Sequence, residues 1–306
     1  MSVSPLVGVL GVRLEALAEH LPAALEGDVT GVHQARVASR RLREAVPVAG
    51  AALRPGRVRR AARRLRRVTT WLGPVRELDV TLGLIVRLAA QRPDLGDALE
   101  VVRARVAGAR ELHRARLVSR LDAEAAKQLI ARMERFAARA VAAVDQDAWR
   151  ISLAGRVETR AGVLRQCVEE AGLLYDSHRL HEVRIAAKKL RYALELAGES
   201  HLTATARLLS RLKRVQDTLG DLHDLEILDA FAQAASAVPD AEAARDTLAT
   251  LRDHLQAECR RLHAKFLGAR PKLVAVADQA RDRVALRVVV PVDAATAARA
   301  ADGQRP

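Results

Sequence analysis

Three segments in the first half of this 306-residue chain recur in the second half, in the same order. The matching pairs are 33–43 (HQARVASRRLR) with 181–191 (HEVRIAAKKLR), 64–79 (RLRRVTTWLGPVRELD) with 211–226 (RLKRVQDTLGDLHDLE), and 110–117 (RELHRARL) with 260–267 (RRLHAKFL). Their offsets are 148, 147 and 150 residues. A near-constant offset of this size indicates a tandem duplication, and it is too long for a solenoid repeat. We therefore expect two related halves that pack together.

Apolar residues recur at every third or fourth position along nearly the whole chain, which is the periodicity of amphipathic helices. Alternating β-branched residues are scarce, so the sequence predicts an all-α fold. The one strand-like run, Val284 to Val292, is interpreted as part of a tail, and the N-terminal apolar run up to Arg13 as the start of an amphipathic helix. Glycine or proline predicts helix boundaries at seven places: Gly27–Asp28, Pro55–Gly56, Gly73–Pro74, Pro93, Gly220–Asp221, Pro239 and Pro271.

The duplication and the helical pattern together predict how the chain is organised. We expect one helical repeat over residues 1–147, a second over residues 148–290, and a flexible C-terminal tail over residues 291–306. Half of the residues are apolar, so both repeats can bury a core.

The charge of the chain is strongly positive. It has 51 Lys and Arg against 37 Asp and Glu, a net charge of +14, and only six of the cations are lysines. Such an excess predicts attraction to polyanions, and the planar arginine fork matches phosphate oxygens. Aromatic residues make up only 2% of the chain, which argues against a protein that stacks nucleic-acid bases.

The two cysteines, Cys167 and Cys259, are too few for a disulfide framework or a cysteine metal cluster. No stretch approaches the roughly 20 apolar residues that span a bilayer, and the N-terminus lacks the basic region of a signal peptide. We expect a cytoplasmic protein.

The segment that begins at His33 would have two distinct faces as a helix, and its duplicate would have the same two. The first copy places a cationic stripe on one side: His33, Arg36, Arg40 and Arg43, with Arg41 at its edge. The second copy repeats it: His181, Arg184, Lys188 and Arg191, with Lys189 at its edge. The opposite faces are apolar and predict the core: Ala35, Ala38, Leu42, Ala45 and Val46, then Val183, Ala186, Leu190, Ala193 and Leu194. One such stripe is usually solvated surface, but its retention in both halves favours a binding role.

The next helix of each half is again apolar on one side. The predicted core residues are Leu65, Val68 and Leu72, and Leu208, Leu212, Val215 and Leu219. Cations that could contact a ligand lie elsewhere on these helices: Arg66, Arg67, Lys213 and Arg214.

Each of these helices is expected to end at a left-handed glycine, Gly73 or Gly220. The carboxylates that follow would then lie in the first turns of a new helix, where they complement its dipole: Glu77 and Asp79, and Asp224 and Glu226. Arg76 and His223 in these turns are candidate ligand contacts. His113 and His263 are open between core packing and a ligand-facing role.

Other chemistries find less support. His178 and His181 make an H-x-x-H pair, but no cysteine or carboxylate stands at metal-ligand spacing around it, so we expect no metal and no cofactor. No P-loop, G-x-S-x-G or H-E-x-x-H motif is present, and only the acidic pairs 77/79 and 224/226 could hold Mg²⁺ for phosphoryl transfer, so we expect no enzyme. Binding to the phosphate backbone of nucleic acid stays an alternative, although no helix-turn-helix or zinc finger is recognisable.

The paired motifs resemble the CHAD (conserved histidine α-helical domain) family from about residue 6 to residue 270. The resemblance rests on 33–43, on 181–191 with Tyr192 following, and on the Leu-Gly segments 72–79 and 219–226. It implies two four-helix-bundle-like halves related by pseudo-twofold symmetry around a central basic channel. It also implies binding of inorganic polyphosphate by the two stripes, often with association to polyphosphate granules and their proteins. We expect a stand-alone module without the acidic, strand-rich hydrolase region that is often fused to such domains.

The sequence departs from the family pattern in two places. In the second Leu-Gly segment His223 and Glu226 stand where the first has Arg76 and Asp79, and Pro47 follows the first stripe closely enough to kink its helix. The general chemistry agrees with the implied ligand, because polyphosphate is a flexible polyanion that arginine rows can bind by charge-assisted hydrogen bonds. Since a phosphate neighbour favours charged histidine, we predict binding that is sensitive to salt and tighter at pH 6 than at pH 8.

Overall fold

The structure, a computed structural model, describes residues 5–143, 145–237 and 244–288, and their regular secondary structure is helical throughout. The first half contains α1 (Pro5–Glu26), α2 (Val29–Ala49), α3 (Pro55–Gln91), the short 3-10 helix η1 (Pro93–Leu95), α4 (Gly96–Arg120) and α5 (Ala123–Ala142). The second half contains α6 (Gln146–Glu170), α7 (Ser177–Glu199), α8 (Ala206–Ser236) and α9 (Arg245–Val288). The predicted all-α class is confirmed.

Aspartates cap the start of four helices. The carboxylates of Asp28, Asp122, Asp145 and Asp176 each accept a hydrogen bond from a backbone N–H in the first turn of α2, α5, α6 or α7. Gly27, with a φ of 93°, separates α1 from α2. The boundaries predicted at Gly27–Asp28, at Pro55 and at Pro93 are confirmed, because a helix begins or ends at each.

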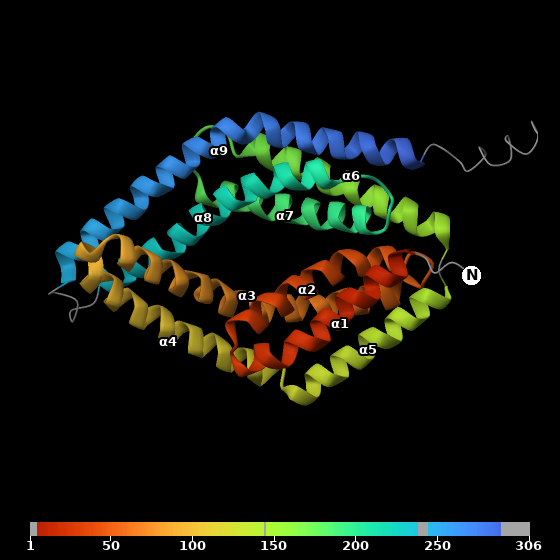
Figure 1. The fold of residues 1–306 in the computed structure, drawn as a ribbon, viewed down its shortest axis with the longest axis horizontal. Coiled ribbons are helices and arrows are strands. Elements are labelled where there is room, and N and C mark those ends of the chain that lie inside the picture. The colour runs from red at the N-terminus through yellow and green to blue at the C-terminus, as the bar shows by residue number, and fades with distance from the viewer. Residues whose placement is uncertain (1–4, 144, 238–243, 289–306) are drawn as a thin grey trace, which may run out of the picture.

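The helices of the two halves pack in the same pattern (Figure 1). In the first half α1 packs against α2 and α5, α2 against α3, and α3 against α4. In the second half α6 packs against α7 and α9, α7 against α8, and α8 against α9. The long helix α9 therefore takes the places of both α4 and α5. This recurrence agrees with the duplication in the sequence, while the pseudo-twofold relation of the halves stays a prediction.

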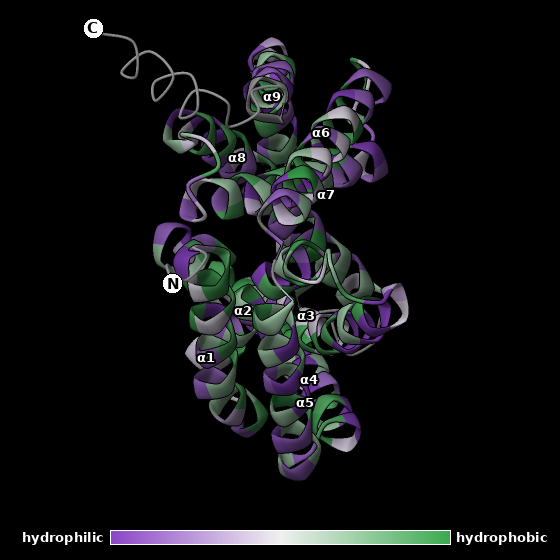
Figure 2. Cartoon of the chain, turned by 90° about the vertical axis from the view of Figure 1, so that its right-hand side faces the viewer, coloured by the Kyte–Doolittle hydropathy of each residue, from purple (hydrophilic) through white to green (hydrophobic). Residues whose placement is uncertain are grey.

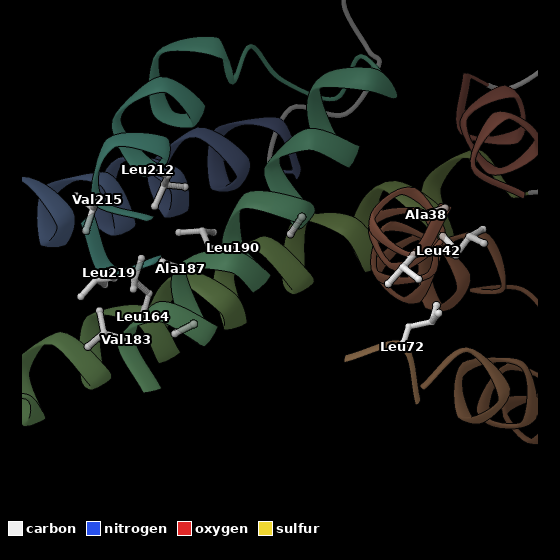
Figure 3. Close-up of a cluster of buried hydrophobic side chains, with 14 of the residues drawn as sticks. Ala38, Leu42, Leu72, Leu164, Val183, Ala187, Leu190, Leu212, Val215 and Leu219 are labelled. Carbon is white, nitrogen blue, oxygen red and sulfur yellow. The ribbon is translucent and has the colours of Figure 1, made fainter. Parts of the chain in front are cut away.

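The halves meet through corresponding helices, because α2 contacts α7 and α3 contacts α8. Hydrophobic and hydrophilic residues interleave along the helices, as amphipathic helices require (Figure 2). Figure 3 shows part of the buried cluster, with Leu190 of α7 and Leu212 and Leu219 of α8 on one side and Leu42 of α2 and Leu72 of α3 on the other. Every core residue predicted on the four duplicated segments is buried. The apolar faces of these helices thus point into the core of their own half, and the opposite, cationic faces point away from that core.

Three predicted helix boundaries are wrong. Gly73–Pro74 lies inside α3, Gly220–Asp221 inside α8, and Pro271 inside α9. Neither Gly73 nor Gly220 has a positive φ. Burial explains the difference at Gly73–Pro74: Leu72, Val75 and Leu78 are all buried, and their packing outweighs the cost of about 1 kcal/mol for glycine and about 3 kcal/mol for proline in a helix.

This correction moves the acidic residues from helix starts to helix middles. Glu77 and Asp79 lie within α3, and Asp224 and Glu226 within α8, so they complement no helix dipole there. Asp79 is buried and pairs with Arg110 of α4 at 2.6 Å. Pro47 likewise lies inside α2 without ending it.

The predicted boundary between the repeats and the predicted C-terminal tail lie near the limits of the described residues or outside them. The expected division between 147 and 148 lies in the first turn of α6, and its role as a domain boundary stays a prediction. Residues 284–288, the first part of the strand-like run, belong to α9, whereas Pro239 and the expected tail 291–306 lie outside the described residues. Within the described part of the chain, no helix is long and apolar enough to cross a membrane.

Candidate functional site

A cavity of about 430 Å³, here called the central pocket, lies between the two halves. Helices α2 and α3 of the first half and α6 and α7 of the second half line it. Its cationic lining residues are Arg36, Arg40, Arg43, Arg160, Arg184, Lys188 and Lys189. His181, Tyr192, Gly73 and two carboxylates, Glu44 and Glu77, also line it. The pocket thus gathers many more cations than anions at the joint between the halves.

The amphipathic pattern of α2 and α7 explains how these side chains reach the pocket. Leu42 of α2 and Leu190 of α7 are fully buried, so the opposite side of each helix faces away from its own core. Because α2 and α7 pack against each other, the two cationic stripes meet across the joint. Arg36 and Arg40 come from one stripe, and Lys188 comes from the other.

The close approach of like charges perturbs the pocket cations. Burial, together with Arg184, Arg40 and Arg36, lowers the pKa of Lys188 to about 6. Burial and Arg40 lower the pKa of Arg36 to about 10. Burial also lowers the pKa of Arg184, partly against the opposing effect of Asp224, whose carboxylate lies 3.9 Å away. Bringing an anion into the pocket would relieve this repulsion, since an opposite charge favours the charged form.

Some hydrogen-bond donors of the pocket are also unused. Within the described part of the chain, the buried Nε atoms of Arg36 and Arg184 have no hydrogen-bond partner. In the same part of the chain, Arg36, Arg40 and Lys188 form no ion pair with a carboxylate. Buried donors without partners are costly in a folded protein, and oxygen atoms of a bound anion would satisfy them.

Ion pairs across the joint surround these cations. Arg13 of α1 pairs with Glu199 of α7 at 2.9 Å, and Arg41 of α2 pairs with Glu195 of α7 at 3.0 Å. The buried Glu44 of α2 pairs with two arginines of α6, Arg156 at 2.5 Å and Arg160 at 3.2 Å. These carboxylates hold the halves together at the edges of the pocket and leave its middle positively charged.

Histidines of the duplicated motifs lie beside the pocket. The rings of His181 and His223 are 4.8 Å apart, and Nε2 of His223 lies 3.2 Å from a carboxylate oxygen of Glu77 in the other half. Burial opposes the charge of His223, but the carboxylates of Glu226 and Glu77 outweigh burial and raise its pKa. Burial and then His223 lower the pKa of His181.

His33 occupies the corresponding place in the first half. Burial, followed by Arg76 and Arg36, lowers its pKa. His33 and Arg76 therefore lie near each other, as His181 and His223 do. The second half has His223 at the position that corresponds to Arg76.

A second cavity of about 370 Å³, here called the side pocket, shares Arg43, Glu44 and Arg160 with the central pocket. It runs between α3 and α6 and adds four further arginines: Arg59, Arg63, Arg66 and Arg156. The two cavities are therefore neighbours, and both have a basic lining.

The structure places the sequence-predicted binding residues in three groups. The first lines the central pocket: Arg36, Arg40, Arg43, His181, Arg184, Lys188 and Lys189. The second lies beside it or in the side pocket: His33, Arg76, His223 and Arg66. The third lies elsewhere: Arg41, Arg67, His113, Arg191, Lys213, Arg214 and His263.

The residues of the third group have other surroundings. Arg41 and Arg191 both pair with Glu195, and Lys213 pairs with Asp217. Arg67 is exposed on α3. His113 lines a small separate cavity between α3 and α4, and Arg214 lines a groove between α8 and α9. His263 is buried with its ring 5.2 Å from that of Tyr175, so of the two predicted roles it has the one in core packing.

Glu44, Arg160 and Tyr192 are among the pocket residues that were missing from the sequence-based set of binders. Glu44 and Tyr192 stand at corresponding positions, 148 residues apart, immediately after the two duplicated stripes, and that equivalence is a signal that could have included them. Arg160 lies on α6, outside the duplicated segments. Only the packing of α6 against α2 brings it to the pocket.

The described residues contain no group of three or more His, Cys, Asp or Glu that could hold a metal ion. The pocket carboxylates Glu44 and Glu77 are engaged by arginines and by His223. What the pocket presents to a ligand is therefore positive charge and N–H donors.

The fold and the pocket together define an all-α protein whose paired cationic helices enclose a positively charged pocket. Residues 8–233 match the CHAD domain, and the chain belongs to this family. It is similar in structure to the CHAD domain from the plant Ricinus communis, with 23% identity, a TM-score of 0.65, and 89% of this chain and 91% of that chain covered. It is also similar to PptA from Streptomyces chartreusis, with 18% identity, a TM-score of 0.60, and 87% and 97% covered. No curated protein sequence matches the chain.

Proposed function

We propose that this protein binds inorganic polyphosphate in the central pocket and does not hydrolyse it. The observation that carries the proposal is the burial of Lys188 beside other pocket cations: burial first, and then Arg184, Arg40 and Arg36, lower the pKa of Lys188 to about 6. Such an arrangement is unfavourable in the free protein and becomes favourable when a polyanion enters. Membership of the CHAD family supports polyphosphate as that polyanion.

The neighbouring positions of the two basic cavities favour a linear ligand. The central pocket and the side pocket share the lining residues Arg43, Glu44 and Arg160, so consecutive phosphates of one chain would contact one cation after another. Arginine can form bidentate, charge-assisted bonds to each phosphate without reading any base. Tyr192 is the one aromatic residue that lines the two cavities, so stacking contributes little.

The pocket carboxylates support binding rather than catalysis. Mg²⁺-assisted phosphoryl transfer needs carboxylates free to hold the metal. Glu44 is already paired with Arg156 and Arg160, and Glu77 with His223. A cytoplasmic protein that joins or organises polyphosphate granules is the role we propose for such a binder.

Titration of the purified protein with long-chain polyphosphate, and separately with duplex DNA, tests the proposal at physiological salt. The variant Arg40→Ala/Lys188→Ala removes one pocket cation from each half. The matched control Arg87→Ala/Arg207→Ala removes two exposed cations that line neither pocket. We expect a strong preference for polyphosphate that the pocket variant loses and the control keeps.

Two outcomes would contradict the proposal. Similar affinity for both polymers, equally weakened in both variants, would mean that the net charge of +14 binds any polyanion without a specific site. Release of orthophosphate from polyphosphate in the presence of Mg²⁺ would make the protein a hydrolase.

A further inference from the structure

Six arginines gather in a cleft that is separate from the central and side pockets. The cleft, a cavity of about 220 Å³ here called the arginine cleft, lies between the start of α3 and α5. Arg57, Arg60 and Arg64 come from α3, and Arg132, Arg135 and Arg139 come from α5. It shares no lining residue with the other two cavities.

Helical spacing explains why the two rows face the same space. Each row has gaps of three and then four residues, which places its arginines on one side of the helix. Because α3 packs against α5, the two rows lie on either side of the cleft. Leu53, Ala61 and Phe136 complete its lining. The cleft is thus built from two regular cationic stripes on packed helices.

The arginines of the cleft have no acidic partners. Across the described part of the chain, none of the six forms an ion pair with a carboxylate, and Glu134 of α5 does not line the cleft. Arginines on the neighbouring α4 do find partners, since Arg103 pairs with Glu100 and Arg114 with Glu111. Burial, followed by Arg132, Arg60 and Arg135, lowers the pKa of Arg64, so the like charges are close enough to repel.

The second half has a related basic groove and not the same cleft. Arg211, the counterpart of Arg64 at the offset of 147, lines this groove between α8 and α9 together with Arg214, Lys265 and Lys272. Arg211 donates a hydrogen bond to Gln279 of α9, much as Arg132 of the arginine cleft donates to Gln128 on its own helix. The cleft of the first half is distinguished by its six arginines, three from each helix.

We propose that the arginine cleft is a second anion site, which binds a short oligophosphate independently of the central pocket. A single phosphate group carries at most about two negative charges at pH 7, too few to match six arginines, whereas several consecutive phosphates can. Planar arginine forks fit phosphate oxygens in pairs. Phe136 is the only aromatic lining residue and it is buried, so the cleft recognises the phosphates and not an attached base.

The test measures binding of tripolyphosphate by calorimetry at physiological salt, in a protein whose central pocket already carries Arg40→Ala/Lys188→Ala. Using this background makes the result independent of whether the central pocket binds long-chain polyphosphate. Three further substitutions, Arg132→Gln, Arg135→Gln and Arg139→Gln, remove the α5 row. We expect them to weaken binding by about tenfold or more, since each charge-assisted contact contributes on the order of one factor of ten.

The matched control is Arg87→Gln/Arg207→Gln/Arg260→Gln, which removes the same charge from exposed residues outside the cleft. We expect it to change the affinity by less than about twofold. Arg57→Gln/Arg60→Gln removes two cleft arginines from α3 and should also weaken the binding of tripolyphosphate. This variant keeps the test possible if the α5 variant folds poorly. ATP without Mg²⁺ should bind like tripolyphosphate if the phosphates alone are recognised.

Three results would overturn the proposal. The background protein could bind no tripolyphosphate, the cleft variants could bind it as well as the background does, or the control could lose as much affinity as they do. The last result would assign the binding to net charge.

Discussion

Binding of polyphosphate should be coupled to the uptake of a proton by Lys188. The pKa of this amine in the free protein is about 6, against an ordinary value of 10.5, because it is buried and faces Arg184, Arg40 and Arg36, which outweigh the opposing charge of Asp224. At pH 8 about 99 in 100 of these amines are then neutral, and at pH 6 about half are. A bound polyanion should restore the charged form, so binding at pH 8 should take up close to one proton.

The size of the effect follows from the same values. If the bound anion returns the pKa of Lys188 to its ordinary range, the dissociation constant should be about fiftyfold lower at pH 6 than at pH 8. The sign is fixed because lowering the pH supplies the proton that the complex holds and the free protein lacks. His33 and His181, whose pKa values burial lowers, act in the same direction but mainly below pH 7. A variant of Lys188 is still needed to isolate its contribution, because burial also lowers the pKa of Lys189 in the same pocket, and nearby carboxylates raise the pKa of His223.

Calorimetry in two buffers of different ionisation enthalpy counts the protons taken up. Lys188→Arg is the decisive variant because an arginine stays charged at both pH values. We expect it to bind polyphosphate and to take up much less proton at pH 8 than the wild-type protein does. Equal affinity of the wild-type protein at pH 6 and pH 8, without proton uptake, would refute the reasoning and remove Lys188 from the site.

Four further variants test other parts of the structure. Gly73→Ala should raise the free energy of unfolding by up to about 1 kcal/mol in urea denaturation, since Gly73 lies inside α3 with open space where an added Cβ would be. A lower free energy of unfolding in this variant would mean that the helix is broken at Gly73. Arg63→Gln/Arg66→Gln removes two arginines of the side pocket and should weaken the binding of long-chain polyphosphate more than that of tripolyphosphate. No loss of affinity for the long chain would exclude the side pocket from its binding site. Glu44→Ala should lower the free energy of unfolding by about 3 kcal/mol, because it leaves Arg156 and Arg160 unpaired. Glu44→Gln should lower it by less, and thermal unfolding of both variants measures the difference.

Local periodicity was enough to predict much of this site. The spacing of His33, Arg36 and Arg40 placed them opposite Leu42 on one helix, and the duplicate did the same for Lys188, because the face of a helix depends only on sequence separation. The same local reasoning misplaced the helix ends at Gly73 and Gly220. Those glycines lie in helices whose continuation is decided by buried neighbours, which a local rule does not include.

The rest of the site depends on contacts between segments far apart in the chain. Arg160 reaches the pocket because α6 packs against α2, and Arg191 is diverted from it because Glu195 holds it. The arginine cleft likewise combines residues of α3 with residues of α5 that no repeat connects. No spacing in the sequence specifies which cations find acidic partners and which do not.

The division between paired and unpaired cations determines how the two halves are held together. Joining two halves through their cationic faces would push them apart unless something opposed the repulsion. Glu199 and Glu195 of α7 and Glu44 of α2 do so at the edges, each bound to an arginine of the other half. The middle keeps more cations than Glu77 and Asp224 balance, and an anion bound there would add to the attraction between the halves. Polyphosphate should therefore stabilise the folded protein against thermal unfolding in proportion to the logarithm of its concentration. Because the ion pairs already hold the joint, the pocket can form before the ligand arrives.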